Sequence, residues 1–137
     1  MDVHNKKIRS YNMSRIHGEN TKPEVNLRKI LWHMGYRYRK NDKNLPGRPD
    51  IVFPGRKKII FVHGCFWHKH DCKYFKWPKT NVDFWTNKIS ENVRRDFKNY
   101  IELSKLGWEC IVIWECELKN SEQKEKALKK IINFLES

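Results

Sequence analysis

The residues best suited to chemistry gather in one short segment, HGCFWHKHDC at positions 63–72. Together with Cys116, this segment offers three thiolates and one imidazole, the donor set of a tetrahedral structural zinc site with no open position for catalysis. Metal binding would fold a loop that lacks regular hydrogen bonding of its own. We therefore predict a structural zinc ion whose ligands are Cys65, His70, Cys72 and Cys116.

The alternative is that these are ordinary buried thiols and surface histidines, because their spacing matches no standard zinc-finger signature. The remaining cysteine, Cys110, enters a predicted strand at the end away from Cys116, and we interpret it as a buried core thiol. Disulfides are not expected in a chain without a secretory signal. Metal ligation is therefore the better interpretation of the clustered cysteines and histidines.

The second chemical feature is Asp50, a carboxylate at the start of a predicted strand. Many metal-dependent nucleases hold Mg²⁺ against the scissile phosphate in this way. The acid and lysine that usually follow on the next strand are replaced by FVH at 61–63. The backbone carbonyl of Val62 would then supply an oxygen ligand, and Glu24 would bind metal-coordinated water. A simple turn carboxylate is the alternative for Asp50 alone.

Two histidines remain for acid–base chemistry if His70 binds zinc. His68 is the candidate general base, because an imidazole with a pKa near neutrality can accept a proton from the attacking water. His63 is the second candidate, placed to bind a metal-bound water or the phosphate. Each histidine taken alone could equally be a satisfied loop residue, so the hypothesis depends on their meeting Asp50 at one edge of the sheet.

Aromatic residues accompany these groups. Phe66 and Trp67 lie inside the proposed zinc loop, and Trp85 begins a long helix on which Lys88 and Asn92 follow along the same partly polar face. Exposed aromatic side chains beside basic residues can wedge between base pairs and unstack them. The alternative is that all three aromatic residues simply pack. The core stripe of the helix is expected to contain Ile89, Val93, Phe97 and Ile101.

Helices and short strands must position these groups. TKPE at 21–24 and TNVD at 80–83 have the form of capping boxes that start helices, and Gly35 and Gly107 end them. Strands are short apolar runs, two of them joined by a turn at 54–56. The expected elements are a helix at 21–34, an edge strand at 36–39, a hairpin of strands at 50–53 and 57–64, a loop at 65–81, a helix at 82–106, a strand at 109–116 and a helix at 121–136.

The order of these elements predicts an α/β fold with a mixed sheet flanked by helices. The strands at 57–64 and 109–116 are joined by a helix, the form of a crossover between parallel strands. Because parallel strands end at the same edge of a sheet, Cys65 and Cys116 should lie together there. The hairpin turn brings Asp50 to that edge as well, where ligands of open α/β sheets tend to bind.

Composition limits the partners. The chain of 137 residues is long enough for one compact domain, and its 29 Lys and Arg against 16 Asp and Glu give a formal charge of +13. Such an excess indicates a polyanionic partner, because cationic side chains release counterions from phosphates; a generally lysine-rich proteome is the alternative. With no signal peptide and no apolar stretch of membrane-spanning length, we expect a cytoplasmic protein with no membrane partner.

Five segments together resemble the very-short-patch-repair (Vsr-type) DNA mismatch endonucleases, a zinc-containing branch of the restriction-endonuclease-like PD-(D/E)xK superfamily. The block around HGCFWH with a following HxC is the most specific of them. The matching segments cover nearly the whole chain in order: DVHNKKIRSYNMSRI (2–16), LPGRPDIVF (45–53), FVHGCFWHKHDCKYFKWP (61–78), FWTNKISENVRRD (84–96) and LGWECIVIWECEL (106–118).

The resemblance implies a strand-specific nick beside the thymine of a T:G mismatch, which arises when 5-methylcytosine deaminates. It implies Mg²⁺ at Asp50 and the carbonyl of residue 62, with His68 as general base. Glu24 and His63 would bind the hydrated metal, and zinc would take the four ligands named above. Val62 stands where the family more often has threonine, which matters little if only its carbonyl binds metal.

Further roles follow from the same resemblance. Asp96 matches a family acidic residue that assists His68, although it lies about 20 Å along the helix from its start. Residues 1–18, including Met13, would form an arm that clamps the opposite groove, and 19–137 would form a single endonuclease domain. The protein would be bacterial and associated with the nucleoid. The side chains that intercalate next to the mismatch would be Phe66, Trp67 and Trp85.

The implied partners are double-stranded DNA with a T:G mismatch and, functionally, a cytosine-5 DNA methyltransferase whose sites produce it. A monomer is expected because an asymmetric mismatch needs one nick, and stimulation by a mismatch-repair protein is left open. One alternative is a nuclease of the same fold with another DNA target, which matched and mismatched duplexes would separate. The other is a zinc-stabilised DNA-binding module without catalysis, in which Asp50→Ala would remove nothing that depends on Mg²⁺.

Overall fold

The computed structural model describes residues 21–137, in a chain that divides into two compact units after Tyr36. The described part of the first unit holds one helix, α2 (Lys22–His33). Thr21 occupies the N-cap as predicted, but its side chain makes no capping hydrogen bond. The Glu24 carboxylate instead accepts a hydrogen bond of 2.8 Å from Arg28, one turn further along the helix. The helix position is therefore confirmed, whereas its capping is not.

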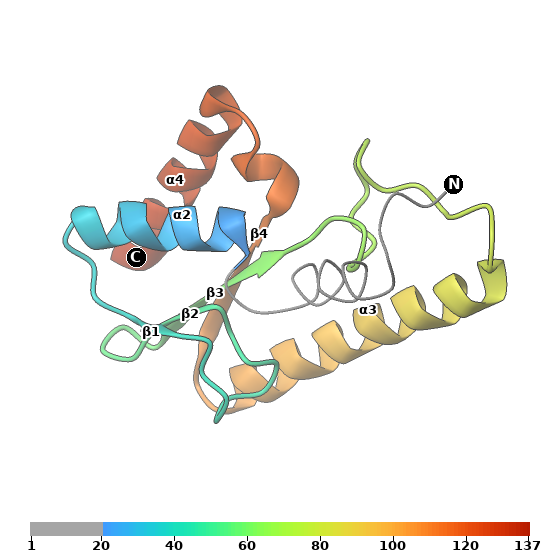
Figure 1. The fold of residues 1–137 in the computed structure, drawn as a ribbon. Helices are drawn as coiled ribbons and strands as arrows, with labels where there is room; N and C mark the ends of the chain where they lie inside the picture. Colours follow the sequence, from blue (N-terminus) through green and yellow to red (C-terminus); the bar gives the residue numbers. More distant parts are fainter. Residues whose placement is uncertain (1–20) are drawn as a thin grey trace, which may run out of the picture. The chain divides into compact units, whose positions relative to one another are not determined.

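The second unit, Arg37–Ser137, is built on a four-stranded sheet in the order β1-β2-β3-β4. The first three strands pair antiparallel, and β3 and β4 pair parallel. Figure 1 shows β4 running beside β3, to which it is joined by a long crossover connection that contains α3. The predicted mixed α/β sheet is thereby confirmed. The strands are β1 (Arg39–Lys40), β2 (Ile51–Phe53), β3 (Lys58–His63) and β4 (Glu109–Trp114).

The register of the hairpin sets the position of Asp50. Ile51 pairs with Ile60 across β2 and β3, so Asp50 falls opposite Phe61. This agrees with the turn predicted around Gly55. A shift of one residue would send every side chain of the strand to the other face, and the continuous burial of β2 on both faces resists such a shift.

The parallel pair aligns the carboxyl ends of two strands. His63 lies beside Trp114 at the last position of the ladder. Cys65 follows two residues after His63, and Cys116 lies on the short 3-10 helix η1 (Glu115–Leu118) that begins where β4 stops. The crossover predicted from the order of the elements therefore brings both cysteines to one edge of the sheet.

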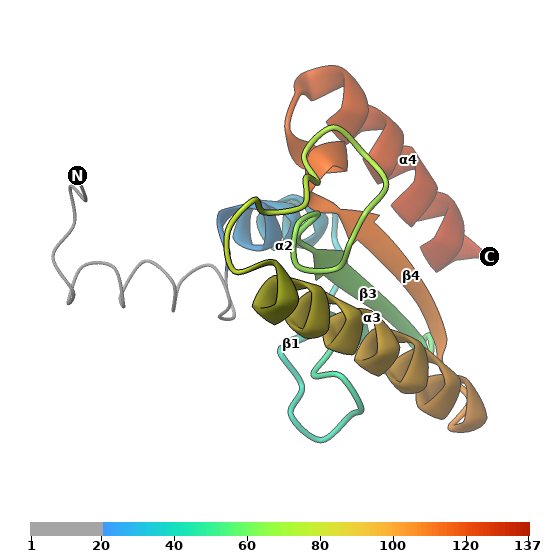
Figure 2. The same ribbon diagram turned by 90° about the vertical axis from the view of Figure 1, so that its right-hand side faces the viewer.

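A helix lies on each face of this sheet (Figure 2). Alternate residues of β3 point to opposite faces of the sheet. The helix α3 (Val82–Lys105) covers one face. The helix α4 (Ser121–Glu136) covers the other face, where Lys58 Nζ donates to the carbonyl of Phe134. No helix among residues 21–137 has the length and apolar character needed to cross a membrane. The core beneath α3 contains Val52, Ile59, Phe61 and Leu103, with Leu45, Tyr100, Trp108, Cys110 and Val112 packed against it.

The inward face of α3 differs from the prediction. Ile89 is buried as expected, but Phe97 and Ile101 are 62% and 56% exposed. The prediction was wrong because it chose the most apolar stripe, whereas the sheet-facing side of α3 serves both the core and a polar site. The capping box predicted at 80–83 is also wrong, since Asn81 is the N-cap, in a left-handed backbone conformation without a side-chain cap. The residues of α3 that contact the loop or the sheet include Asn92, Asp96, Tyr100 and Leu103.

Candidate active site

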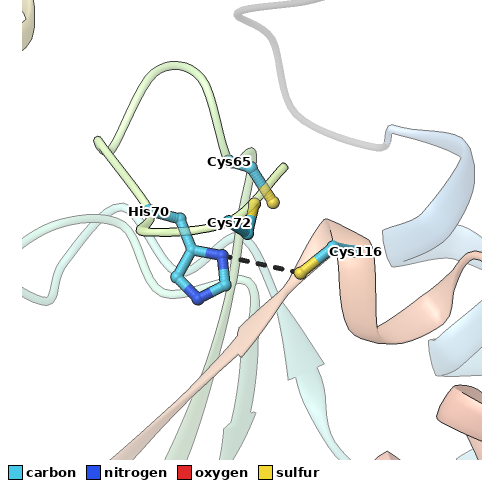
Figure 3. Close-up of side chains that lie close together, drawn as sticks. All are labelled: Cys65, His70, Cys72 and Cys116. Atoms are coloured by element: carbon cyan, nitrogen blue, oxygen red, sulfur yellow. Dashed lines mark hydrogen bonds between the residues drawn. The ribbon is translucent and has the colours of Figure 1, made fainter. Parts of the chain in front are cut away.

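The four candidate zinc ligands converge beyond the carboxyl ends of β3 and β4. Their ligand atoms all lie within 4.8 Å of one another, and Figure 3 shows the side chains of Cys65, His70, Cys72 and Cys116 pointing toward one another. His70 Nδ1 is 3.5 Å from Cys116 Sγ. In a tetrahedral site of three sulfurs and one nitrogen, neighbouring ligand atoms are roughly 3.5–3.8 Å apart, given the usual Zn–S and Zn–N distances. The donor set and its spacing therefore fit zinc.

Local contacts hold these ligands in place. The backbone N–H of His70 donates to the carbonyl of Cys65 at 2.9 Å, which closes a turn of the loop. Trp114, the last residue of β4, stacks on the His70 ring with centroids 4.1 Å apart and planes 7° apart. Cys110 lies at the other end of β4 and packs against the core as predicted, although it is half-buried rather than buried. The four-ligand group therefore depends on the loop, on η1 and on the end of β4 together.

Burial changes the acidity of two thiols. It raises the pKa of Cys110 to about 11 and, as the largest of several causes, the pKa of Cys65 to about 12. A thiol with so high a pKa stays protonated near neutral pH unless a cation stabilises the thiolate. Binding of a metal at Cys65 would therefore release a proton and would weaken as the pH falls.

A second cluster lies next to the first and contains two histidines, a carboxylate and a phenol. His68 Nδ1 is 2.5 Å from Asp96 Oδ2, and the rings of His63 and His68 stack with centroids 3.8 Å apart and planes 10° apart. His63 Nε2 is 2.7 Å from Tyr100 Oη and 4.0 Å from Asp96 Oδ1. Asp96 reaches this cluster because α3 runs along the loop, with Trp85 beside Phe66 and Trp67 near its start and Asp96 beside His68 at its middle.

The environment keeps two members of this cluster uncharged. Burial lowers the pKa of His63 well below its usual value, and the neighbouring His68 lowers it further. Burial also raises the pKa of Tyr100, and the Asp96 carboxylate adds to that effect. The hydrogen bond between His63 and Tyr100 is therefore one between neutral partners at pH 7.

Asp50 lies just before β2, with its carboxylate against the neighbouring strand. The backbone N–H of Val62 donates to Asp50 Oδ2 at 2.6 Å. In an extended strand the N–H and C=O of one residue point to the same side, so the carbonyl of Val62 faces the side on which Asp50 lies. Carboxylate and carbonyl oxygens are the ligands that Mg²⁺ prefers. These two residues therefore fit the predicted magnesium site.

The predicted wedge residues form one aromatic cluster. Ring centroids of Phe66 and Trp67 are 5.0 Å apart, and Trp85 lies 5.5 Å from each of them. All three are half-buried. Asn92 Nδ2 donates to the carbonyl of Trp67 at 3.1 Å, which ties the loop to α3. Lys88 is half-buried one turn after Trp85.

Two predicted site residues belong to the first unit. Glu24 lies on α2, where it pairs with Arg28. Met13, together with the arm predicted at 1–18, lies outside the described residues. Their predicted roles in metal binding and in groove clamping stay predictions.

Two residues at the site escaped the sequence analysis, Tyr100 and Trp114. Tyr100 follows Asp96 by one helical turn, so it shares a face of α3 with the carboxylate. Trp114 is the ladder partner of His63 and also lies 5.5 Å from it, ring centroid to ring centroid. Helical periodicity counted from Asp96 and the parallel register counted from His63 would have found both.

Known proteins are similar to this chain over most of its length. Residues 1–74 match the family model of the DNA mismatch endonuclease Vsr. The chain is 52% identical over 119 residues to the type II nicking enzyme V.NmeAIP of Neisseria meningitidis serogroup A, covering 87% of this chain and 85% of that protein. It is 44% identical over 122 residues to the DNA mismatch endonuclease Vsr of Escherichia coli, covering 89% and 78%. The type II nicking enzyme V.XorIIP of Xanthomonas oryzae is 43% identical over 125 residues, covering 91% and 92%.

Proposed function

Because this chain belongs to the Vsr family of DNA mismatch endonucleases, we propose that it nicks one strand of duplex DNA beside the thymine of a T:G mismatch. The observation that carries the proposal is the meeting of Asp50, Val62, His63, His68 and Asp96 at one sheet edge. Oxygen donors for a cation and a carboxylate-bound histidine are the groups needed for metal-assisted hydrolysis of a phosphodiester. We also assign the fold to the PD-(D/E)xK superfamily, and the position of Asp50 just before a strand supports this assignment. The acid and lysine that usually follow on the next strand are replaced here.

Asp50 and the carbonyl of Val62 would hold Mg²⁺. His63 and, as the family resemblance implies, Glu24 would contact its water ligands. When bound, Mg²⁺ supplies charge for the developing phosphorane and polarises water. The protein supplies the alignment: hairpin register keeps the Asp50 carboxylate against residue 62, and burial keeps His63 neutral so that it can bind water or phosphate without repelling the cation.

His68 would act as the general base, positioned by Asp96. With its Nδ1 bonded to the carboxylate, the ring is favoured as the tautomer that carries its proton on Nδ1. Nε2 is then the atom that accepts a proton from the attacking water. When the ring becomes an imidazolium, the Asp96 carboxylate stabilises it across the same hydrogen bond.

Phe66, Trp67 and Trp85 would contact the DNA next to the mismatch. Half-burial leaves part of each ring accessible, and the rings pack against one another, Phe66 edge-on to both tryptophans, which makes the cluster a stiff wedge. Unstacking a base step next to a mismatch needs less free energy than unstacking a paired one. Lys88 and Asn92 would face the same groove, and the 29 Lys and Arg of the chain favour binding to phosphates. Residues 1–18, with Met13, would clamp the opposite groove.

Zinc at Cys65, His70, Cys72 and Cys116 would hold the loop that carries both His68 and the wedge. We expect Cys116→Ala to abolish stoichiometric zinc binding and to lower the free energy of unfolding by roughly 4 kcal/mol or more, because a structural metal contributes directly to folding. Zinc content by atomic emission and unfolding in urea measure both effects.

The matched control is Cys110→Ala, which removes a half-buried thiol that packs against the core near the start of β4, the strand that precedes η1 and Cys116. This variant should retain one zinc per chain and lose only about 1 kcal/mol. Retention of zinc by the Cys116 variant, or its loss from the Cys110 variant, would contradict the assigned ligand set.

A nicking assay tests the proposed substrate. Duplexes that carry one T:G pair in each of several flanking contexts are labelled on the thymine strand and incubated with the zinc-loaded protein and Mg²⁺. We expect a single nick beside the thymine in at least one context, no cut in the matched duplex, and no cut when EDTA replaces Mg²⁺. Equal cutting of matched and mismatched DNA would point to another target, and an absence of cutting in every context would contradict the proposal.

Two further proposals concern the partners. The contexts that are cut should coincide with the sites of a cytosine-5 DNA methyltransferase, because deamination there creates the T:G pair. A single chain should suffice for one nick, so the nicking rate should rise linearly with protein concentration.

A further inference from the structure

Tyr100 lies beside the proposed catalytic residues but has no role in the mechanism proposed above. It lies on α3, one turn after Asp96, and its hydroxyl oxygen is 2.7 Å from His63 Nε2. Its ring packs edge-on against Phe61, with centroids 5.5 Å apart and planes 64° apart. Because the ring is half-buried against the core, the direction of the hydroxyl is fixed by packing.

One carboxylate faces two imidazoles at this site. Asp96 Oδ2 is 2.5 Å from His68 Nδ1, while Asp96 Oδ1 is 4.0 Å from His63 Nε2. The two rings are stacked 3.8 Å apart, so they approach the carboxylate side by side. A proton on Nε2 of His63 would place a second N–H dipole 4.0 Å from Asp96 Oδ1, so this ring would compete with His68 for the charge of the carboxylate.

We propose that Tyr100 is a positioning residue that donates its O–H to Nε2 of His63, holds this ring in the Nδ1–H tautomer and thereby reserves the Asp96 carboxylate for His68. The proposal rests on the role of His68 proposed above. A nitrogen that accepts a hydrogen bond from a phenol carries no proton of its own, so His63 has nothing to donate toward Asp96. Its Nδ1–H is then the donor available to phosphate or water.

The direct test is the tautomer of His63 in the zinc-loaded protein. Long-range ¹H–¹⁵N spectra of histidine-labelled protein at mildly alkaline pH distinguish a protonated Nδ1 from a protonated Nε2, and the His63→Gln variant assigns the signal. We expect Nδ1–H in the wild type and a shift of population toward Nε2–H in Tyr100→Phe, which removes only the hydroxyl.

Activity supplies a second readout. In Tyr100→Phe the single-turnover nicking rate should fall about two- to tenfold, the effect of one hydrogen bond between neutral partners. The Kd for mismatched DNA should stay unchanged, because Tyr100 lies behind His63. In an Asp96→Ala background the same substitution should have no further effect, since there is no carboxylate left to reserve.

Tyr38→Phe is the matched control, because Tyr38 is a half-buried tyrosine that packs on Phe53, away from the histidines. It should leave both the tautomer and the rate unchanged. A wild-type His63 with its proton on Nε2, or an unchanged tautomer in Tyr100→Phe, would overturn the proposal. The spectra need no substrate, so they test the role of Tyr100 independently of nicking. If Tyr100→Phe shifts the tautomer of His63 but the wild type cuts no T:G duplex, the positioning role of Tyr100 stands and the proposed function is refuted.

Discussion

Replacing Asp50 with asparagine is expected to lower the rate of Mg²⁺-dependent nicking by roughly a thousandfold or more. Charge stabilisation by a bound metal contributes several kcal/mol to such reactions, and each 1.4 kcal/mol corresponds to about a factor of ten. Asparagine suits the test because its side-chain oxygen can still accept the N–H of Val62 that the Asp50 carboxylate accepts now. The hairpin should therefore keep its register while the metal loses its charged ligand.

DNA binding separates loss of catalysis from loss of structure. Asp50→Asn should bind mismatched DNA as tightly as the wild type or more tightly, because a negative charge near the phosphate has been removed. Fluorescence anisotropy gives the Kd, and single-turnover nicking gives the rate. The control is Asp42→Asn, in the loop before β2, where the Asp42 carboxylate accepts a local N–H from Asn44 at 2.9 Å. A nicking rate in Asp50→Asn within tenfold of wild type would refute the metal-ligand role.

His68→Ala is expected to lower the nicking rate by about 10²–10⁴-fold, the usual contribution of a general base. The loss should appear in the chemical step and leave the Kd for DNA nearly unchanged. His33→Ala, at an exposed histidine at the end of α2, serves as the matched control. If the two variants cut equally well, His68 is not the base.

Asp96 allows a sharper comparison within the same prediction. Asp96→Asn should be more damaging than Asp96→Ala, because an amide N–H at the position of Asp96 Oδ2 would donate to Nδ1 of His68 and leave the proton on Nε2. Combining either substitution with His68→Ala should add little, since the two residues act as one unit. Additive losses would mean that Asp96 contributes independently of His68.

The sequence predicted the elements whose patterns are local. The apolar runs of β3 and β4 and the turn between β2 and β3 were enough to place Asp50 at the sheet edge opposite residues 61–63, Cys65 at the end of its strand and Cys116 close to it. The parallel crossover followed from a helix between two strands. These placements follow from the periodicity of the apolar residues and from the rules of strand connection. Both depend little on the particular tertiary contacts that the side chains make.

The sequence failed where a buried face is polar. Periodicity treats apolar residues as core, so it selected Phe97 and Ile101, which the structure leaves exposed, and passed over Tyr100. Polar residues are buried here because partners from the loop and from β3 satisfy their hydrogen bonds, and a pairing between distant segments has no signature in the periodicity of one segment. The capping of α2 and α3 failed for a related reason, since their caps depend on local geometry that residue type alone does not determine.

The parallel pairing of β3 with β4 also bears on how the chain is synthesised. A ribosome releases Asp50, His63 and His68 well before β4 and η1, because the whole of the 24-residue helix α3 lies between them. The nascent chain can form the local β2–β3 hairpin early, but the indole of Trp114 and the thiol of Cys116 arrive only later. Until then the loop that carries His68 can contact α3, but it lacks the stacking of Trp114 on His70 and the candidate ligand Cys116. A chain truncated before β4 would therefore hold most of the proposed catalytic residues without the contacts that complete the loop, and we expect it not to nick DNA.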